Sequence, residues 1–458
     1  MIEFLFSSLS VNNVFGKIKR LPKWINLSLL ALNKNPYLIF GKKFKQYSKF
    51  LKNTNEKYCN TKLLLNTVNR AINEIPYYRK LYGDKKITSI KEFENNIKFI
   101  DKDTILQNYS DFINPLINYN NYDFGTTGGT SGRPLKLAAP KMRYIVELAT
   151  MHSLWKSAGY NFNVRAVIRN KRLGANESYL VNPITREIIF DGFRLDDDYF
   201  EIIYKVIKKF NIRFIHCYPS VAFEFSTFLL NKEHDTSFIK AFLSSSENIF
   251  DYQVDLIQNR LGIRFYNWYG HSEKLILAGY CENTNIYHVE PTYGYFELID
   301  ENNRLISEPG KIGEIVGTGF HNPGMFFIRY RTGDFAEFGG NFCPFCKRHI
   351  TLLNNIIGRW SGNKIYNKDG SFATTTALNL HSNLYSVING LQYFQEKKGE
   401  LKVLVIKSTE YKEIHERELY KHFKTRLKAD TVVRIQYVKK LIKQPNGKFL
   451  HIISKIDD

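Results

Sequence analysis

The chain has 458 residues, more than one ordinary domain needs, and this length predicts two or three domains. Its 43% hydrophobic residues exclude a disordered chain, and five cysteines in this length exclude a disulfide framework. The net charge of +21 favours anionic partners such as nucleotides, nucleic acid or an acidic membrane surface. A bias of the genome produces the same charge, so charge alone assigns no function.

The first sixty residues alternate apolar clusters, such as residues 4–6 and 24–30, with lysines and arginines. We interpret residues 1–60 as a helical extension packed on the main domain. The alternative is an amphipathic segment in peripheral contact with an anionic membrane. No apolar run reaches about 18 residues and no basic signal region opens the chain, so we expect a cytoplasmic protein, with contact at the inner membrane face as the alternative.

Residues 60–120 have helical and then loop-like patterns, and a loop rich in Gly, Ser and Thr covers residues 121–137. Beyond it, helices alternate with short apolar strands, which is typical of a parallel α/β sheet. The predicted helices cover residues 141–158, 199–210, 220–230 and 250–261, and the predicted strands cover residues 164–169, 212–216, 241–244 and 263–268.

Strands without intervening helices follow at residues 294–300, 313–318 and 326–330, which predicts an antiparallel, barrel-like subdomain. Past a boundary near residues 355–362, a strand, a helix and a strand indicate a small α+β domain (401–407, 413–427 and 432–438). The predicted fold class is therefore α/β. Its predicted parts are an N-terminal extension (1–60), a large domain (61–357) and a small, mobile C-terminal domain (358–458).

The most informative stretch is the loop Thr-Thr-Gly-Gly-Thr-Ser-Gly-Arg-Pro at residues 126–134. Its glycines allow backbone amides to approach an anion closely, and its hydroxyls and Arg133 add donors and positive charge. It lacks the Gly-Lys-Ser/Thr ending of a Walker A loop, and taken alone it is equally compatible with a flexible surface loop. The candidate phosphate-binding residues are Thr127, Gly128, Gly129, Thr130, Ser131 and Gly132.

Five further segments follow this loop in a fixed order, at residues 244–247, 269–273, 330–334, 358–359 and 445–448. Together with the loop they resemble the motifs of the adenylate-forming superfamily, which includes acyl-CoA synthetases and peptide-synthetase adenylation domains. The nearest resemblance is to the phenylacetate–CoA ligase-like branch and its capsular-polysaccharide-biosynthesis proteins. Each motif is weak, but six in one order over residues 60–458 are specific.

The resemblance implies an enzyme that uses ATP to convert a carboxylate into an acyl-adenylate and pyrophosphate, then transfers the acyl group to a thiol or amine. It implies that Lys448 bridges the carboxylate and the α-phosphate, that Glu273 holds Mg²⁺, and that Asp334 accepts hydrogen bonds from the ribose. Without the ordered set of motifs, each of these three residues is better interpreted as a solvated surface or turn residue. The further expected nucleotide contacts are Ser246, Glu247, Tyr269, Gly270, Ser272 and Arg359.

A second group of residues suits a metal. Cys343 and Cys346 form a Cys-x-x-Cys pair, and Cys281 and His288 lie upstream with six residues between them. Three thiolates and one imidazole suit tetrahedral zinc, so these four residues are candidate ligands of a structural Zn²⁺. The spacing resembles a site in some phenylacetate–CoA ligase-like proteins. His349 is the substitute for His288, and a redox pair or ordinary core residues are the alternatives.

The acid that is activated is not identified by the sequence. Aromatic segments around Trp155, Tyr218, Trp268 and His271 are expected to form the acyl site. The candidate acceptors are coenzyme A, a carrier-protein thiol and an amine on a sugar, and the resemblance indicates cell-envelope polysaccharide or natural-product biosynthesis. No nucleic-acid-binding motif accompanies the charge, so nucleic acid is not an expected partner. The alternatives are a catalytically retired scaffold, a basic nucleic-acid-binding protein and a phosphotransferase that uses the same loop.

Overall fold

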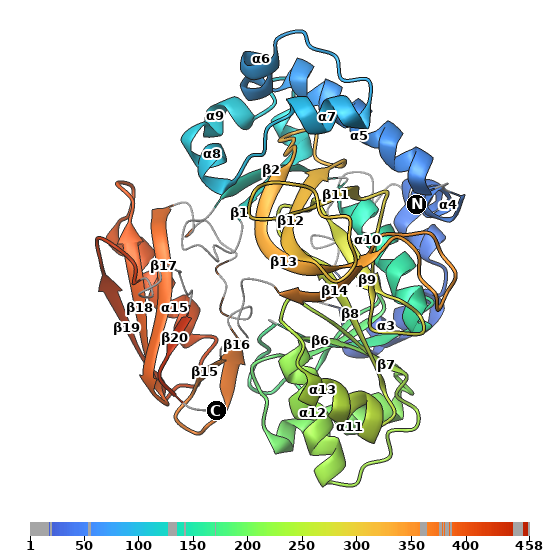
Figure 1. Ribbon diagram of the computed structural model, residues 1–458. Coiled ribbons are helices and arrows are strands. Elements are labelled where there is room, and N and C mark those ends of the chain that lie inside the picture. Colours follow the sequence, from blue (N-terminus) through green and yellow to red (C-terminus); the bar gives the residue numbers. More distant parts are fainter. Residues whose placement is uncertain are drawn as a thin grey trace.

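The structure is a computed structural model. It describes residues 18, 21–53, 56–126, 135–141, 143–169, 171–357, 364–374, 378, 380, 384, 387–442 and 452–456. A helical N-terminal layer, a large sheet with flanking helices and a small sheet follow one another along the chain (Figure 1). The predicted α/β class, with a large sheet-rich part and a small C-terminal part, is confirmed. None of the helices in these ranges combines the length and apolar character that crossing a bilayer requires.

The N-terminal layer consists of helices of 4 to 19 residues that pack on the large sheet. Two of them begin at a side-chain cap: the Ser89 side chain accepts from the backbone N–H of Glu92, and Asp101 accepts from that of Thr104. The helices are α3 (Lys23–Leu32), α4 (Pro36–Asn53), α5 (Glu56–Glu74), α6 (Pro76–Tyr82), α7 (Ile90–Asn96), α8 (Lys102–Gln107) and α9 (Tyr109–Phe112).

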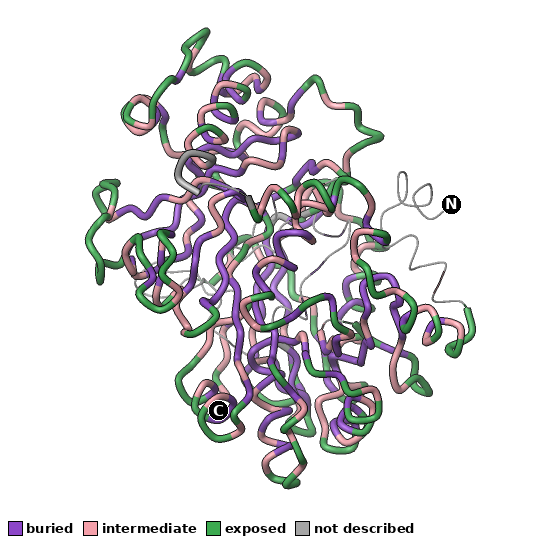
Figure 2. The backbone as a smooth tube through the Cα atoms, turned by 90° about the vertical axis from the view of Figure 1, so that its right-hand side faces the viewer, coloured by how far each residue is buried: buried purple, intermediate pink, exposed green. Residues whose placement is uncertain are grey.

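The parallel part of the large sheet has the order β8-β7-β6-β3-β5, with β4 antiparallel at the edge. Its strands are β3 (Arg165–Arg169), β4 (Leu180–Asn182), β5 (Glu187–Asp191), β6 (Phe214–Cys217), β7 (Ala241–Ser245) and β8 (Arg264–Gly270). The associated helices are α10 (Arg143–Trp155), α11 (Asp197–Lys209), α12 (Pro219–Asn231) and α13 (Asp251–Val254), the last continued by the π-helical turn η3 (Asp255–Arg260). Strands flanked by helices on a sheet are buried on both faces, and Figure 2 shows long buried stretches of backbone in the interior.

Antiparallel strands extend the same sheet to twelve strands, in the order β11-β12-β13-β14-β10-β9 before β8. They are β9 (Leu277–Tyr280), β10 (Tyr287–Val289), β11 (Gly294–Ile299), β12 (Ile312–Gly319), β13 (Tyr330–Gly340) and β14 (Leu352–Ile357). Figure 1 shows that this end of the sheet is strongly curved.

The strand predicted at residues 326–330 is wrong, because β13 begins only at Tyr330. The hydroxyl of Tyr78 donates to the carbonyl of Phe326 and accepts from the N–H of Ile328. These backbone groups therefore bond to a side chain of the N-terminal layer instead of to a neighbouring strand.

The C-terminal part contains a four-stranded sheet in the order β19-β18-β17-β20 and a separate hairpin, β15–β16. Helix α15 connects the parallel strands β18 and β19, so the predicted strand, helix and strand are confirmed. The elements are β15 (Lys364–Tyr366), β16 (Phe372–Thr374), β17 (Ile388–Lys397), β18 (Glu400–Lys407), α15 (Glu413–Lys424), β19 (Val432–Tyr437) and β20 (Ile452–Ser454). The boundary at residue 358 falls outside the described residues and stays a prediction. Residue 60 lies within α5, and the boundary expected there also stays a prediction.

Candidate active site

The carboxyl ends of β3, β6, β7 and β8 meet at one edge of the parallel sheet. Ligands of open α/β sheets bind at this edge. Three of the predicted nucleotide contacts lie there: Ser246 directly follows β7, and Tyr269 and Gly270 end β8. Ser272 and Glu273 lie in the turn that follows β8.

Two side-chain hydrogen bonds connect this edge to β13. The Tyr269 hydroxyl donates to Oδ2 of Asp334 across 2.9 Å, and the Tyr330 hydroxyl donates to Oε1 of Glu273 across 3.2 Å. In the sheet order β14, β10 and β9 lie between β13 and β8. Four strand spacings in a flat sheet amount to about 19 Å. The curvature of the sheet therefore brings the two predicted motifs together.

The backbone around Gly333 directs Asp334 toward Tyr269. The pairing of β12 with β13 shifts register here, and Gly333 adopts a φ of 72°, which glycine tolerates without steric cost. Glu314 fixes this bulge, since Oε1 accepts from the N–H of Gly333 (3.0 Å) and Oε2 accepts from Nε of Arg331 (2.8 Å). Asp334 is 6% exposed, so its carboxylate sits at a defined and nearly buried position.

Glu273 is equally fixed. The N–H of Ile276 donates to Nε2 of His271 across 3.3 Å, which makes this nitrogen an acceptor and assigns the ring proton to Nδ1. The Nδ1–H group donates a hydrogen bond to Oε2 of Glu273 across 3.1 Å. His271, expected in the acyl site, therefore positions the Glu273 carboxylate.

Glycines in β11 and β12 allow these strands to pack closely against the segment after Glu273. A Cβ at Gly294 would lie 1.8 Å from the carbonyl oxygen of Leu275, and one at Gly317 would lie 2.9 Å from side-chain atoms of Leu275 and Ile276. Only glycine permits this approach, which holds the turn carrying Glu273 against the sheet.

The Gly-rich loop connects two paired strands. The hairpin of β1 (Tyr122–Thr126) and β2 (Lys136–Pro140) pairs Thr126 with Lys136, so both ends of the loop are held together. The hairpin packs on the chain just before β13, where the N–H of Ala138 contacts the sulfur of Met325 at 3.2 Å. The candidates Thr127, Gly128, Gly129, Thr130, Ser131 and Gly132 lie outside the described residues, and so do Arg359 and Lys448; their roles stay predictions.

Ser246 and Glu247 have separate roles in the structure. Ser246 adopts a φ of 73°, an uncommon conformation for a residue with a side chain, and its Oγ accepts from Nη2 of Arg169 at 3.2 Å. The Glu247 carboxylate accepts from the N–H of Ser220 at 3.0 Å, in the first turn of α12. Negative charge is favourable at a helix N-terminus, so this side chain stabilises α12 beside the site.

Arg169, which no sequence motif marked, lies at the carboxyl end of β3. Its Nη1 donates to Nε2 of His216 at 2.6 Å, and its guanidinium lies 4.4 Å from the ring centroid of Tyr218. Burial, reinforced by Arg169 and Arg165, holds the pKa of His216 well below its usual value, so this histidine remains neutral. Four residues earlier on β3, Arg165 pairs with Glu187, whereas no carboxylate in the described ranges pairs with Arg169.

Two tryptophans surround the histidine. The ring centroid of His216 lies 5.4 Å from that of Trp155 and 5.3 Å from that of Trp268, and the tryptophans are 5.4 Å apart. The structure thus brings together three of the four residues expected around the acyl group, Trp155, Trp268 and Tyr218, and adds a cation and a neutral imidazole. Arg169 was not identified from the sequence; its position at the end of a predicted parallel strand is the signal that could have identified it.

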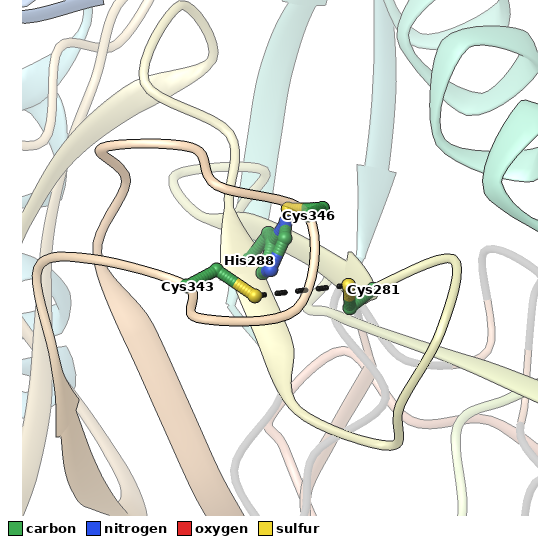
Figure 3. A group of neighbouring side chains, drawn as sticks. All are labelled: Cys281, His288, Cys343 and Cys346. Carbon is green, nitrogen blue, oxygen red and sulfur yellow. Dashed lines mark hydrogen bonds between the residues drawn. The ribbon is translucent and has the colours of Figure 1, made fainter.

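The predicted metal ligands also converge (Figure 3). Cys281 follows β9, His288 lies in β10, and Cys343 and Cys346 lie in the loop between β13 and β14. One ligand atom from each lies within 4.8 Å of all the others, and Sγ of Cys281 is 3.8 Å from Sγ of Cys343. Two thiolates bound tetrahedrally to zinc at about 2.3 Å are about 3.8 Å apart.

The electrostatics of this cluster fit a metal. Burial, followed by Arg348, lowers the pKa of His288 to about 4, so its imidazole is neutral and available as a ligand. Its Nε2 is buried and has no hydrogen-bond partner in the described part of the chain. Burial raises the pKa of the Cys343 thiol, but hydrogen bonds from the backbone N–H groups of Cys346 and Phe345 and with the thiols of Cys346 and Cys281 lower it overall. Burial raises the pKa of the Cys346 thiol to about 11. The residues present therefore fit Zn²⁺.

Comparison with known proteins agrees with this geometry. The family model of the CapK C-terminal domain matches residues 365–455. Protein CapK of Staphylococcus aureus is 22% identical, over 91% of this chain and 88% of that protein.

The solved structures that resemble the chain include 2-hydroxyisobutyryl-CoA ligase. Its complex with 2-HIB-AMP and CoA in the thioesterification state has a TM-score of 0.57 and 14% identity, covering 87% of this chain and 89% of that one. An open conformation with the same ligands has a TM-score of 0.54 and 15% identity, covering 88% and 91%. The chain therefore has the fold of the adenylate-forming ligases, resembles CapK over most of its length and carries a CapK C-terminal domain.

Proposed function

We propose that this protein is an AMP-forming ligase. A carboxylate oxygen of the acid attacks the α-phosphorus of ATP, the bond to the bridging oxygen breaks, and pyrophosphate leaves with that oxygen. A thiolate or amine then attacks the acyl carbon, and AMP leaves. The observation that carries this proposal is the meeting of Tyr269 and Glu273 with Tyr330 and Asp334 at the carboxyl edge of the sheet.

The described residues have distinct roles in this proposal. Asp334 accepts hydrogen bonds from the ribose hydroxyls, and Tyr269 orients that carboxylate while its ring stacks on adenine. The Glu273 carboxylate, which accepts from Tyr330 and His271 at the edge of the sheet, is the proposed ligand of a cation. Mg²⁺ bound there supplies positive charge to the phosphate oxygens. Lys448 and the Gly-rich loop complete the charge stabilisation of the crowded phosphates.

The acid is proposed to carry a second polar or anionic group. The guanidinium of Arg169 is oriented by hydrogen bonds to His216 and Ser246, which are both neutral. No carboxylate in the described ranges pairs with it. The two groups that accept from this half-buried guanidinium, an imidazole and a hydroxyl, are neutral, so its positive charge attracts a polar or anionic group of the acid. A hydroxy acid or a dicarboxylate supplies such a group, and a purely aliphatic acid does not. Trp155 and Trp268 limit the size of the acyl chain beside it.

The acceptor is proposed to be a thiol, with coenzyme A as first candidate, because 2-hydroxyisobutyryl-CoA ligase of the same fold is described with CoA. A carrier-protein thiol and a sugar amine are the alternatives. The resemblance to CapK favours cell-envelope polysaccharide biosynthesis. The cluster of Cys281, His288, Cys343 and Cys346 is proposed to hold a structural Zn²⁺ that ties β9 and β10 to the loop after β13.

The test is exchange of labelled pyrophosphate into ATP over a panel of carboxylic acids that includes hydroxy acids, dicarboxylates, aryl acids and amino acids. Exchange that depends on one class of acid is expected. Formation of ADP instead of AMP would replace the proposal by a phosphotransferase. ATP binding without exchange for any acid would favour a retired scaffold.

A further inference from the structure

Helices α3 and α4 form a surface with an unusual charge. Residues 21–53 contain seven lysines and no acidic residue. The whole chain has 65 basic and 44 acidic residues, so a bias in composition does not account for a complete absence of acids here. Figure 1 shows this region on the flank opposite to the small C-terminal sheet.

The inner faces of both helices are fixed to the protein. Asn26 and Leu30 of α3 are buried, and the carbonyl of Leu30 accepts from Nη1 of Arg186 at 3.1 Å. Phe40 and Phe44 of α4 pack on His152 of α10, with ring centroids 6.1 and 5.7 Å apart. Both helices therefore pack on the rest of the protein, and only their outer faces are open to a partner.

The exposed side chains of the two helices include large apolar residues and a row of lysines. Trp24, Leu32 and Leu38 are 69%, 78% and 71% exposed, which makes them three of the four most exposed large hydrophobic residues in the described chain. After the kink at Gly41, the lysines of α4 recur at spacings of three, four and three residues and share one helix face. They are Lys42, Lys45, Lys49 and Lys52.

No acidic partner balances this row. Among the residues that the structure describes, none of its four lysines forms an ion pair, and Lys52 instead lies near Lys156 and contributes to lowering the pKa of Lys156, after burial. Single exposed apolar residues are common on soluble proteins. Exposed Trp and Leu side chains and unbalanced lysines within one short segment are typical of surfaces that bind lipid bilayers, because the apolar side chains enter the headgroup region while the lysines attract anionic lipids.

We propose that this surface, the α3–α4 face (Trp24, Leu32, Leu38, Lys42, Lys45, Lys49 and Lys52), binds reversibly to an anionic lipid bilayer. A nucleic acid would use the lysines but leaves the three apolar tips in water, so the lipid surface is the better match. The inference is independent of the proposed ligase reaction, since none of these residues lies at the carboxyl edge of the sheet.

The test is co-sedimentation of the full-length protein with sucrose-loaded vesicles of phosphatidylcholine, with and without phosphatidylglycerol. Binding that requires phosphatidylglycerol and weakens with salt is expected. Each lysine near the surface contributes roughly a fivefold change in affinity, so changing Lys42, Lys45, Lys49 and Lys52 to glutamine should weaken binding at least tenfold. A matched control changes Lys86, Lys91, Lys98 and Lys439, which are exposed elsewhere, and should have little effect.

A second variant tests the apolar tips with the charge unchanged. Trp24→Ser with Leu38→Ser should also weaken vesicle binding, but should leave retention on heparin and on duplex DNA as in the wild type. Thermal unfolding establishes that each variant is folded. Equal vesicle binding by the lysine variant and its matched control would overturn the proposal, as would absence of binding to anionic vesicles. Loss of DNA binding without loss of vesicle binding would assign the lysines to nucleic acid instead.

Discussion

The hydroxyl of Tyr269, at the end of β8, donates to the carboxylate of Asp334 in β13 across 2.9 Å, although three strands separate β8 from β13 in the sheet. This contact exists only because the sheet curves, and it couples two motifs that are 65 residues apart. In the proposed ribose contact, the hydrogen bond from Tyr269 fixes the orientation of the Asp334 carboxylate.

Substitution of Asp334 or of Tyr269 should therefore lower kcat/KM for ATP, and the two losses should differ in size. Asp334→Asn removes a charged acceptor, and kcat/KM for ATP should fall roughly 10- to 100-fold, while Tyr269→Phe removes one neutral donor and should cost about 2- to 10-fold. Pyrophosphate exchange at varied ATP measures both. Tyr411→Phe deletes the hydroxyl that contacts Tyr437 in the C-terminal part, and should leave KM for ATP unchanged. An Asp334→Asn enzyme with wild-type KM for ATP would exclude the ribose contact.

The unbalanced guanidinium of Arg169 predicts which acids are activated. Arg169→Gln should lower kcat/KM for the preferred acid roughly 10- to 100-fold, because a charge-assisted hydrogen bond is lost, with little change in KM for ATP. Arg169→Lys should recover only part of this, since lysine lacks the fork that contacts His216 and Ser246 together. Equal losses for every acid, together with a raised KM for ATP, would assign Arg169 to the nucleotide.

The Cys and His cluster predicts about one zinc per chain in protein purified without chelators. Changing both Cys343 and Cys346 to serine should abolish zinc and lower the melting temperature, because two of the four ligands in a loop between strands are lost. Metal analysis and thermal unfolding measure the two effects, with Cys59→Ser as the control. Wild-type protein that is folded and free of metal would contradict the zinc site.

The motifs could be identified from the sequence because the reactive residues of each lie within a few consecutive positions. The contacts between motifs were not. Glu273 meets Tyr330 only after the sheet has curved, and the Arg169–His216 contact joins adjacent strands whose register no local pattern specifies. The false strand at residues 326–330 has the same cause, since the hydroxyl of Tyr78, about 250 residues away, determines its backbone conformation.

Lys448 is outside the described residues, so its role rests on the motif and is open to a direct test. Lys448→Ala should reduce adenylate formation by about 100-fold or more, since it removes a positive charge that stabilises the transition state. Exchange of pyrophosphate measures the loss, circular dichroism the fold, and Lys440→Ala is the control. Unchanged exchange would remove Lys448 from the mechanism.

His152 predicts how stability depends on pH. It lies among Phe40, Phe44 and Trp155, and burial, followed by Arg165 and Lys156, lowers its pKa to about 3 from 6.5. Between these values the unfolded chain binds a proton that the folded protein does not, so the free energy of unfolding falls as pH falls from 6.5 toward 3.

The contribution of one such histidine is about 1.4 kcal/mol per pH unit, or about 2 kcal/mol between pH 6.5 and 5. His152→Gln should reduce the acid sensitivity by this amount, measured from urea unfolding at pH 7.5 and 5.0, whatever the absolute stability of the variant. His415→Gln on the surface helix α15 is the matched control and should leave the difference between the two pH values unchanged. If His152→Gln and wild-type protein lose the same free energy on acidification, His152 is protonated in the folded state, and the aromatic contacts around it do not exclude the charge.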